Sequence, residues 1–540
     1  MIRNFSALRW TGLSVVLLTC LLCRATAVPN FVFIYADDLG WGDLACHGRP
    51  RLETPNIDRM ASEGVDFHQF TVCNPVCSPS RTAIVTGHFP SRHGVHQHFA
   101  SHADNVGRGM PDWLDPRAAL LPRILKEGGY LTAHYGKWHL SGGAIADAPL
   151  PAEYGYDDAA VYTGPGRHVF AGTSYAEMTQ SAHDQQAASF LSVAATDHAV
   201  EFIRKAGRQP FYLNLWLHET HHLVSATEKE KERYLDIQEP ERTYYAAVTR
   251  ADACVGRILS VLKERGLDEN TLVIFSSDNG PENSHRNVGE KFYYSVGSTG
   301  GLRGRKRSLL MGGVNVPFIA RWPGIIPAGR VDKQTPLAGV DILPTFVAAA
   351  GLSLPEGYVS DGENILPVLR GEPWRRTKPL FWFWQGKHTG DDWPAWSMRD
   401  GRWGLVMDET RQRIELYDLQ ADRGQRQNLV EADPQRARMM RQSLMAWGAS
   451  LPSHPTSRQI EQSYAERRAG AKRSPTPPAA KVDRDAAFKK KDLNRDNQLS
   501  LEEYLYRFPK PDEGRQRFPR FDKNGDGVLS YEEFVHPNGR

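Results

Sequence analysis

From residue 30 to about residue 351, short apolar runs alternate with longer amphipathic segments. Four runs have the length and continuous apolar character of buried strands, at residues 31–36, 130–135, 211–217 and 272–275. Helical patterns lie between them. One covers 54–64, with Thr54 as the predicted N-cap and Pro55 in the first turn, and a longer one covers 241–265. This alternation predicts an α/β fold with a mostly parallel sheet.

The pattern changes beyond residue 378. Short aromatic strand-like pieces run to 429 and predict a small antiparallel sheet, followed by a helix over 434–447. Residues 451–480 are rich in Pro, Ser, Ala and charge, which predicts a linker rather than a folded element. The predicted segments are a leader at 1–27, a main domain at 28–375, a C-terminal subdomain at 376–450, a Pro-rich linker at 451–482 and a separate unit at 483–540.

The first 27 residues are typical of a secretory signal peptide. Two early arginines precede an apolar run at 13–22, and small residues at 25–27 predict cleavage before Val28. An uncleaved anchor helix would need a longer apolar run. A lipoprotein site would need a small residue where Thr19 precedes Cys20. We therefore expect a secreted or periplasmic protein with no membrane span after cleavage.

Composition excludes several function classes. The 540 residues include 66 Lys plus Arg and 63 Asp plus Glu, so the net charge of +3 lacks the surplus that nucleic-acid binding needs. A hydrophobic content of 40% is enough for a sizeable core. Four cysteines remain after signal cleavage, too few for a disulfide framework: Cys46, Cys73, Cys77 and Cys254. If one of them has another role, the other three allow one bridge at most.

Polar side chains follow each of the four predicted strands. They are Asp37 and Asp38, Lys137 and His139, His218 and His221, and Asp278 and Asn279. Because ligands of open α/β sheets bind outside the carboxyl ends of the strands, we expect these groups to meet at one edge. The carboxylates and the amide offer only oxygen ligands, which suits Ca²⁺ or Mg²⁺ better than Zn²⁺. The sequence predicts one divalent ion there.

Cys77 is predicted to begin a helix that runs to about Thr86 and ends at Gly87. Free N–H groups at a helix N-terminus favour an anion, and Arg81, one turn further on, can reach the same place. Taken alone, such a cysteine is a low-pKa nucleophile or a buried structural thiol.

The segment Cys77-x-Pro79-x-Arg81 followed by Thr86-Gly87 resembles the signature of the type I, formylglycine-dependent sulfatases, of the arylsulfatase and N-acetylgalactosamine-6-sulfatase kind. In that family a maturation enzyme oxidises this cysteine to Cα-formylglycine. Four further segments resemble the family: 37–43 and 278–280 its metal-binding segments, 136–139 its lysine–histidine segment, and 302–313 the segment of its sulfate-binding lysine, here Lys306. Residues 415–429 are similar to its C-terminal subdomain. The resemblance implies an alkaline-phosphatase-like α/β sandwich with a small C-terminal antiparallel α+β subdomain.

Two segments depart from the family pattern. Where the family often has Glu-Gly-Gly-x-Arg after its lysine, this chain has Met311-Gly312-Gly313-Val314-Asn315. The family's leaving-group histidine often stands in Pro-His-x-Pro, whereas residues 218–222 read His-Glu-Thr-His-His. His221 aligns best, while His218 and His222 stay open as alternatives.

The resemblance implies a catalytic cycle with a hydrated formylglycine at position 77. Metal ligands would be Asp37, Asp38, Asp278, Asn279 and residue 77 itself, around one Ca²⁺. A hydroxyl on Ca²⁺, deprotonated with help from Asp278, would attack sulfur.

Lysine and arginine side chains then have an electrostatic role in the implied cycle. Arg81, Lys137 and Lys306 would stabilise the sulfuryl oxygens, with Lys137, Lys306 and His221 contacting the substrate. His221 would protonate the leaving alcohol, and His139 would take the proton that lets sulfate depart. Sulfated carbohydrates are the expected substrates, with aryl sulfates as surrogates.

The last unit carries two EF-hand loop patterns. The complete loop offers ligands from Asp522, Asn524, Asp526, Val528 and Glu533, and the other from Asp492, Asn494, Asp496, Gln498 and Glu503. Asn497 stands where Gly is expected, and Asn tolerates the left-handed backbone that this position needs. Leu499 and Leu529 occupy the apolar loop position through which paired hands meet. We expect an all-α pair that binds up to two calcium ions with a structural or docking role.

Two other functions compete with sulfate ester hydrolysis. A phosphodiesterase of the alkaline-phosphatase-like superfamily would show Thr or Ser as nucleophile and ligands for two metals, which Cys77 and the single-ion ligand set oppose. A catalytically dead calcium-binding module on polysaccharide would have no reason to keep Cys77, Arg81, Lys137, His139 and Lys306 together.

Overall fold

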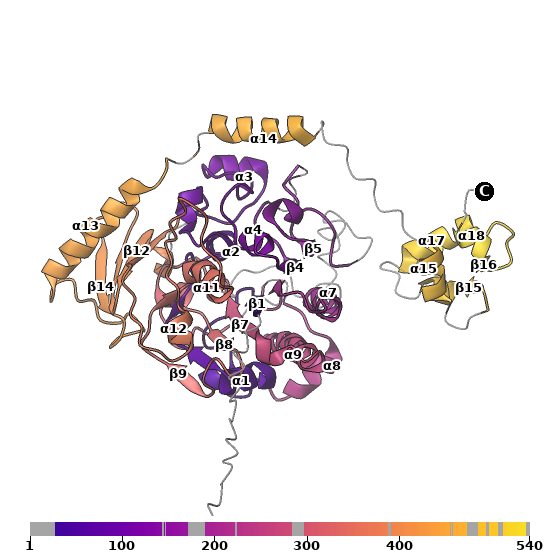
Figure 1. Ribbon diagram of the computed structural model, residues 1–540, viewed down its shortest axis with the longest axis horizontal. Helices are drawn as coiled ribbons and strands as arrows, with labels where there is room; N and C mark the ends of the chain where they lie inside the picture. The colour runs from indigo at the N-terminus through magenta and orange to yellow at the C-terminus, as the bar shows by residue number, and fades with distance from the viewer. Residues whose placement is uncertain are drawn as a thin grey trace, which may run out of the picture. The chain divides into compact units, whose positions relative to one another are not determined.

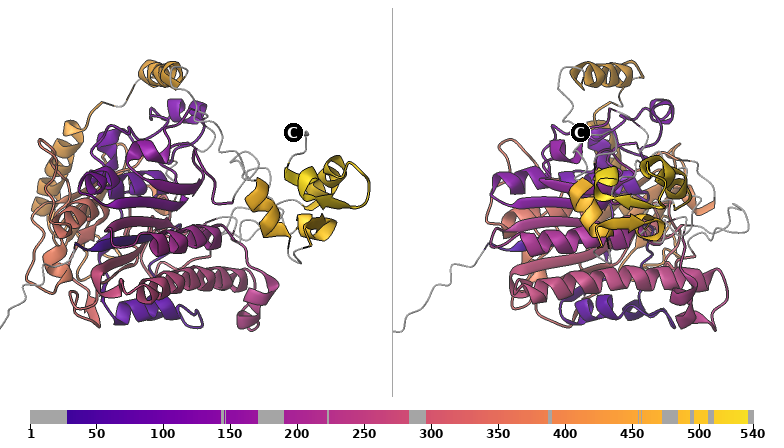
Figure 2. Two further views of the ribbon diagram at one scale, coloured as in Figure 1. Left: turned by 45° about the vertical axis from the view of Figure 1, so that its right-hand side comes forward. Right: turned by 90° about the vertical axis from the view of Figure 1, so that its right-hand side faces the viewer.

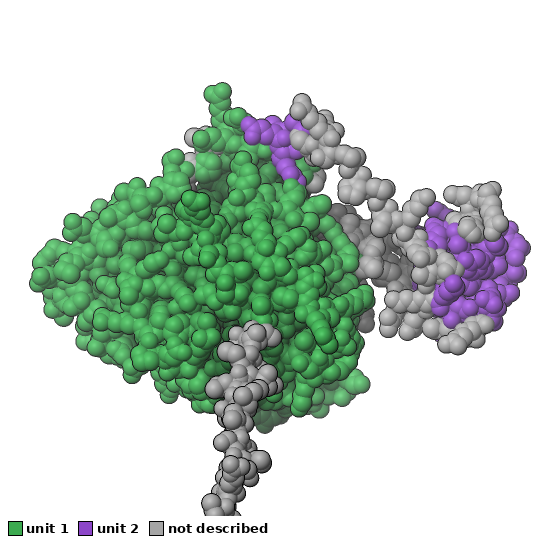
Figure 3. All heavy atoms as spheres, viewed as in Figure 1, with its two compact units in different colours: residues 1–464 green, residues 465–540 purple. Residues whose placement is uncertain are grey.

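The computed structural model describes residues 28–142, 145, 147–170, 190–221, 224–282, 296–386, 390–453, 455, 457–471, 484–492, 496–505 and 511–535. The chain divides into two compact units, residues 1–464 and 465–540 (Figure 3). The predicted signal peptide lies outside the described residues. Among the described helices, none combines the length and apolar character needed to cross a lipid bilayer.

An eight-stranded sheet forms the centre of the first unit (Figure 1). Its strand order is β5 (Asp158–Tyr162), β4 (Leu131–Lys137), β6 (Phe211–Trp216), β1 (Asn30–Ala36), β7 (Thr271–Ser277), β8 (Phe318–Arg321), β2 (Val65–Phe67) and β9 (Arg330–Asp332). The five strands from β5 to β7 are parallel, and β8 is antiparallel to both of its neighbours. The four predicted strands and the mostly parallel sheet are confirmed.

Alternate residues of the central strand β1 pack into two separate hydrophobic layers. Phe31, Phe33 and Tyr35 belong to one layer, and Val32 and Ile34 to the other. The second layer is covered by α1 (Pro55–Ser62), α7 (Leu191–Lys205) and α9 (Glu241–Glu264). The first is covered by α2 (Cys77–Thr86), α4 (Leu121–Glu127) and α11 (Ile342–Ala349). The continuous apolar sequence of β1 follows from this burial on both faces, and Figure 2 shows the layers from two sides.

The N-terminus of α1 differs from its prediction. Thr54 makes no side-chain cap; its hydroxyl donates to Asp58 at 3.0 Å instead. The N–H groups of Asn56 and Ile57 are taken by Asp252 of α9, at 3.0 and 2.8 Å. A carboxylate from another helix therefore caps α1, which no local pattern could indicate.

Smaller elements complete the first unit. They are β3 (Phe70–Thr71), α3 (His102–Gly107), α8 (Glu228–Lys231), α10 (Met311–Val314), β10 (Leu337–Ala338) and α12 (Leu366–Leu369), with short 3₁₀ turns between them. The four cysteines of the described residues are unpaired thiols.

An antiparallel four-stranded sheet follows, as the aromatic pattern predicted. It has the order β11 (Leu380–Phe383), β12 (Trp396–Asp400), β13 (Trp403–Met407) and β14 (Ile414–Asp418). Helix α13 (Pro434–Ser450) packs on it, with the ring of Trp447 stacked on Phe381 at 5.0 Å between centroids. The aromatic residues of this region are therefore core residues of the subdomain.

The segment predicted as a linker contains a helix. Residues Ser457–Ala471 form α14, and Ile460 of this helix is buried. The ring of Tyr464 lies 4.7 Å from His102, and Glu461 lies 3.0 Å from the Nε2 of the same histidine. The prediction of an unfolded linker was wrong over α14, because composition does not report contacts with a distant helix such as α3.

The second unit holds two helix–loop–helix repeats. Its elements are α15 (Arg484–Lys491), β15 (Gln498–Ser500), α16 (Leu501–Leu505), α17 (Pro511–Phe521), β16 (Val528–Ser530) and α18 (Tyr531–Val535). The loops meet through an antiparallel ladder that pairs Leu499 with Leu529, as predicted, so the unit is not purely helical. Asn497 has the left-handed φ of 63°. Asn494 lies outside the described residues.

Candidate active site

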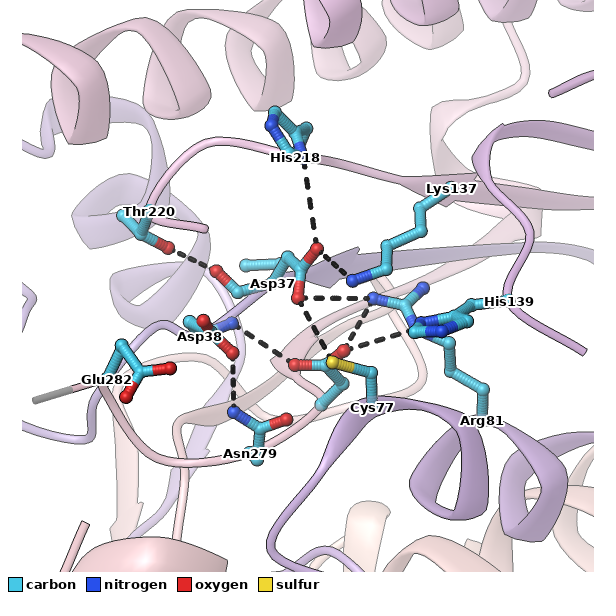
Figure 4. A network of polar contacts seen from close by, with 12 residues as sticks. Asp37, Asp38, Cys77, Arg81, Lys137, His139, His218, Thr220, Asn279 and Glu282 are labelled. Atoms are coloured by element: carbon cyan, nitrogen blue, oxygen red, sulfur yellow. Dashed lines mark hydrogen bonds and ion pairs between the residues drawn. The ribbon is translucent and has the colours of Figure 1, made fainter. Parts of the chain in front are cut away.

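The predicted polar groups do meet at the carboxyl edge of the parallel strands (Figure 4). Asp37 and Asp38 follow β1, Asp278 and Asn279 follow β7, and Cys77 stands at the first position of α2. Ligand atoms of the three aspartates and of Cys77 lie within 4.8 Å of one another, and all four residues are buried.

Asn279 completes the oxygen-rich cluster. Its Nδ2 donates to Asp38 Oδ1 at 2.7 Å, while its Oδ1 is buried and has no hydrogen-bond partner within the described residues. A buried amide oxygen without a partner is costly unless a cation or water contacts it. Asp38 itself adopts a left-handed φ of 60°, a conformation that Asp tolerates better than most residues. The geometry thus provides carboxylate and amide oxygens directed at one place.

Each buried carboxylate has a cationic partner. Three bonds make the pairs: Lys137 Nζ to Asp37 Oδ2 at 2.5 Å, Lys306 Nζ to Asp38 Oδ2 at 2.6 Å and Arg81 Nη2 to Asp278 Oδ2 at 2.6 Å. The guanidinium of Arg81 also lies 4.8 Å from the centroid of Trp216, so its plane is held on an aromatic ring. Buried pairs of this kind are stable only when both partners are present.

The three carboxylates differ in acidity. Burial alone would raise the pKa of Asp37, but the charges of Lys137 and other nearby cations hold it well below its usual range. Burial, opposed by Lys306 and assisted by Asp37, raises the pKa of Asp38 to about 7. Burial and the charge of Asp37 raise the pKa of Asp278 as well. The cluster is therefore crowded with negative charge, and an additional cation would relieve it.

The Cys77 thiol is not set up as a thiolate. It is only 3% exposed, and burial raises its pKa to about 12. Its Sγ lies 3.7 Å from Asp37 Oδ1, a contact that disfavours further negative charge. An ordinary low-pKa cysteine nucleophile is opposed by this environment.

Two histidines approach the cluster from the segment after β6. A ring nitrogen of His221 lies within 4.8 Å of both Cys77 Sγ and an Asp37 oxygen. His218 Nδ1 lies 3.9 Å from Asp37 Oδ2, and its ring packs edge-on against Tyr162. His222 lies outside the described residues. Of the two described candidates, the geometry sets His221 against Cys77.

His139 lies on another side of the site, after β4. Its backbone is left-handed with a φ of 53°, and its Nε2 donates to the carbonyl of Phe99 at 3.1 Å. Burial and the charge of Lys137 lower its pKa well below its usual value. Its Nδ1 is buried without a partner in the described residues. The lowered pKa favours the neutral imidazole, in which Nδ1 is the ring atom able to accept a proton.

The glycine pair that this chain retains after Lys306 has a structural reason. The N–H of Gly280 donates to Gly313 O at 2.9 Å, and the N–H of Lys306 donates to Pro281 O at 3.1 Å. A Cβ on Gly312 would lie 2.0 Å from the carbonyl oxygen of Gly304. The retained glycine pair therefore allows the lysine loop to pack against the loop of Asp278, while Met311 is buried and Asn315 bonds to Phe70 O at 3.0 Å.

Two polar residues of the site were not predicted from the sequence. Glu282 lies 3.7 Å from Lys306 Nζ and accepts from Arg307. Thr220 has a strained φ of 83° and donates from its hydroxyl to the backbone oxygen of Asp37. Glu282 could have been suspected because it follows Asn279 by three residues in the same loop. For Thr220 the sequence holds no signal beyond its place between two histidines.

The chain matches known families over most of its length. Residues 29–352 match the family described as Sulfatase, and residues 305–446 match the family described as N-sulphoglucosamine sulphohydrolase, C-terminal. Residues 484–505 and 515–536 match the family described as EF hand.

Several characterised proteins are similar in sequence. N-acetylgalactosamine-6-sulfatase of Canis lupus familiaris is 35% identical over 384 residues, covering 66% of this chain and 68% of that protein. Steryl-sulfatase of Mus musculus is 32% identical over 424 residues, covering 64% of this chain and 66% of that protein. Arylsulfatase A of Homo sapiens is 31% identical over 389 residues, with 66% and 70% covered.

Solved structures share the fold. Ps i-CgsB in complex with k-i-k-neocarrahexaose has a TM-score of 0.67 and 25% identity, covering 82% of this chain and 99% of that one. The PsFucS1 sulfatase from Pseudoalteromonas sp. has a TM-score of 0.61 and 23% identity, covering 79% and 91%. Taken with the family match over residues 29–352, these similarities establish that the chain belongs to the sulfatase family and is a hydrolase of sulfate esters.

Proposed function

We propose that the protein is a calcium-dependent sulfatase that removes sulfate from sulfated glycans through a formylglycine formed at Cys77. The observation that carries the proposal is the placement of Cys77 among three buried aspartates, each paired with a cation. A phosphodiesterase of the alkaline-phosphatase-like superfamily would have Thr or Ser as its nucleophile, whereas this chain has Cys77 among the aspartates.

The residues around Cys77 fit a calcium ion. Asp37, Asp38, Asp278 and Asn279 supply only oxygen ligands, and Asn279 Oδ1 is buried without a partner in the described part of the chain. A bound calcium ion would supply Lewis-acid activation and charge neutralisation. The aspartates and Asn279 would hold it, and Lys137 and Lys306 would keep their carboxylates oriented.

Charge at the site favours an anionic substrate once calcium is bound. Asp37, Asp38 and Asp278 contribute −3, and the three cations beside them contribute +3. A divalent ion raises the local sum to +2, in a chain whose overall charge is only +3. Local positive charge of this kind attracts a sulfate ester and stabilises charge on its oxygens.

Two histidines are assigned proton transfers. His221, near Cys77, would hold a proton on its ring and donate it to the oxygen of the departing alcohol. His139, kept neutral by burial and by Lys137, would accept a proton at Nδ1. An aldehyde at position 77, once hydrated, would supply one hydroxyl oxygen as the nucleophile. When the second hydroxyl gives its proton to His139, the bond from carbon to the sulfated oxygen would break, sulfate would leave with that oxygen, and the aldehyde would return to be hydrated again.

The remaining parts of the proposal concern processing and architecture. Residues 1–27 are a cleaved signal peptide, and a formylglycine-generating maturation enzyme acts on Cys77. The chain is secreted or periplasmic. Residues 28–375 carry the reaction, 376–450 form the C-terminal subdomain, and the EF-hand pair at 483–540 binds up to two calcium ions. In the second hand, Asp522, Asn524, Asp526, Val528 and Glu533 supply the ligands, which the match to the EF-hand family supports.

The first test is the mass of the peptide that contains Cys77, measured on protein purified together with its maturation enzyme. An aldehyde in place of the thiol is expected, together with sulfate release from 4-nitrophenyl sulfate that Cys77→Ala abolishes. Chelation should remove the activity and added calcium should restore it. An unmodified thiol in protein that still releases sulfate would refute the formylglycine route.

A second test separates His221 from His218. Loss of the leaving-group acid harms substrates with poor leaving groups most. We expect His221→Ala to reduce kcat/KM about 100-fold more for a sugar sulfate than for 4-nitrophenyl sulfate. The matched variant His218→Ala should show no such difference, and the reverse result would transfer the role to His218.

A further inference from the structure

A cavity of about 810 Å³ lies directly beside Lys306 in the first unit. Its walls come from four segments of the chain: Glu282, the loop from Thr299 to Arg307, residues 390–392, and Gly424 with Arg426. Cavities of this size hold ligands much larger than one sulfate group. Because Lys306 lines the cavity and also bonds to Asp38, the cavity continues the active site outward.

Five cations and three carboxylates line this cavity. The cations are Arg303, Arg305, Lys306, Arg307 and Arg426, and the carboxylates are Glu282, Asp391 and Asp392. The lining therefore has a net charge of 5 − 3 = +2. A concave surface with a surplus of arginine is suited to planar, bidentate recognition of sulfate or carboxylate groups.

Two of the arginines serve to build the wall. Arg303 donates to Asp391 Oδ1 at 3.0 Å and to Glu415 Oε2 at 3.1 Å, which joins the loop after β7 to strand β14. Arg307 forms a two-bonded pair with Glu282. Their charges are balanced by these partners.

The other two arginines are different. Arg305 donates to the backbone oxygen of Gly297, and its buried Nε has no partner in the described residues. Arg426, which is exposed, donates from Nη2 to Gly301 O at 3.1 Å. Within the described part of the chain, neither has a carboxylate partner. Each therefore lines the cavity with a charge that no carboxylate of the described residues balances, and Arg426 also offers the donors of an exposed guanidinium.

We propose that Arg305 and Arg426 form an anion subsite that binds a second acidic group of the substrate, next to the sugar whose sulfate is hydrolysed. This inference rests on the proposed function and narrows its substrate class to glycans with at least two anionic groups. Sulfate and carboxylate share the chemistry that these arginines recognise. A simple aryl sulfate has no group for this subsite.

The test measures binding to the full-length protein by calorimetry with two probes, sucrose octasulfate and trigalacturonic acid. The variants are Arg305→Gln, Arg426→Gln and the double variant. Arg438→Gln, an exposed arginine on α13, is the matched control. Because the double variant removes two charged hydrogen-bonding groups, it should weaken binding of at least one probe by tenfold or more.

The probe that loses more affinity identifies the preferred group, sulfate or carboxylate. Arg305→Lys, which keeps the charge, should recover part of the lost affinity. A change below twofold for both probes, or an equal change in Arg438→Gln, would overturn the subsite. Turnover of 4-nitrophenyl sulfate by the wild-type protein is measured in parallel. If turnover is absent while the arginine-dependent binding persists, the proposed function fails and the anion subsite stands.

Discussion

The two units each carry a group of acidic side chains suited to calcium, in opposite surroundings. In the first unit Asp37, Asp38 and Asp278 are fully buried and lie against lysine and arginine. In the second, Asp522 is half-buried and Asp526 is exposed, and both accept hydrogen bonds from the backbone of their own loop, such as Gly525 N to Asp522 Oδ1 at 2.8 Å. Permanent cations stabilise the first group, whereas the second depends on the ion itself.

This difference separates two effects of calcium. Removing it from the first unit should abolish activity and leave the ion pairs to hold the fold. Removing it from the second should loosen the EF-hand pair and leave the chemistry intact. The following variants break or sharpen the contrast, from the largest expected effect to the smallest.

Lys137→Met should have the largest effect. It leaves the Asp37 carboxylate buried without its closest cation, which should lower the free energy of unfolding by about 3–5 kcal/mol. It also removes the charge that we propose to stabilise the sulfuryl oxygens, so kcat should fall by about 100- to 1,000-fold. Urea unfolding and sulfate release would measure both.

The matched control is Lys205→Met, which breaks an exposed pair with Glu201 on α7. It should cost at most about 1 kcal/mol and leave kcat unchanged. Equal losses of stability in the two variants would show that burial does not decide the cost of breaking an ion pair in this protein.

Gly312→Ala should come next. The new Cβ would meet the Gly304 carbonyl at 2.0 Å, so the lysine loop must shift, at a cost of about 1–3 kcal/mol. Because that loop positions Lys306, kcat for sulfate release should fall as well. In the second unit, Gly525→Ala meets no atom within 4 Å but has a φ of 72°. Because alanine disfavours this left-handed backbone, Gly525→Ala should lower the stability of the second unit by about 1 kcal/mol and leave sulfate release unchanged.

Glu533→Gln tests the second unit alone. Glu533 closes its loop by accepting from Ser530 N at 2.9 Å, and in the EF-hand pattern it is the bidentate calcium ligand. Calcium affinity of that hand should fall by at least about tenfold. Calcium titration by calorimetry measures this, and sulfate release at saturating calcium should not change. A parallel loss of activity would show that the two calcium sites are coupled.

The smallest effect concerns α14 and pH. Hydrogen bonds to Asp112 and then Glu461 raise the pKa of His102 above its ordinary value. A raised pKa in the folded state means that the stabilisation is complete at pH values below the unfolded pKa. It is lost as the pH rises through the folded pKa.

The contribution to the free energy of unfolding is below about 1 kcal/mol because the His102 side chain and its partner Glu461 are both partly exposed to solvent. We expect His102→Gln to lower the melting temperature slightly at pH 5.5 and not at pH 8.5. A larger deficit at pH 8.5 would contradict the sign of this linkage.

Sequence reasoning succeeded where chemistry follows local pattern. Asp37, Asp278 and Lys137 were correctly predicted to lie at one edge of the sheet, because the carboxyl ends of parallel strands lie at the same edge. The pairing of Leu499 with Leu529 followed from the registered EF-hand repeats. Both predictions rest on patterns of apolar and polar residues that are close together in the sequence.

What escaped prediction depends on contacts between distant segments. Asp252 caps α1 from another helix, and α14 forms in a stretch whose composition suggests a linker. The cation that pairs with each aspartate could not be assigned from the sequence, nor could the placement of Arg305 and Arg426 around one cavity. These features arise only when the chain has packed.

The burial of Cys77 sets a time limit on the oxidation that we propose for it. Cys77 is 3% exposed and lies in the first turn of a helix whose ten residues are all buried. The active site of a maturation enzyme could therefore not reach its thiol once the protein has folded. Oxidation must therefore compete with the collapse of the polypeptide around α2. The fraction of active molecules would then depend on the rate of Cys77 oxidation relative to the rate of folding around α2. Conditions that slow folding of the nascent chain should raise the yield of active enzyme.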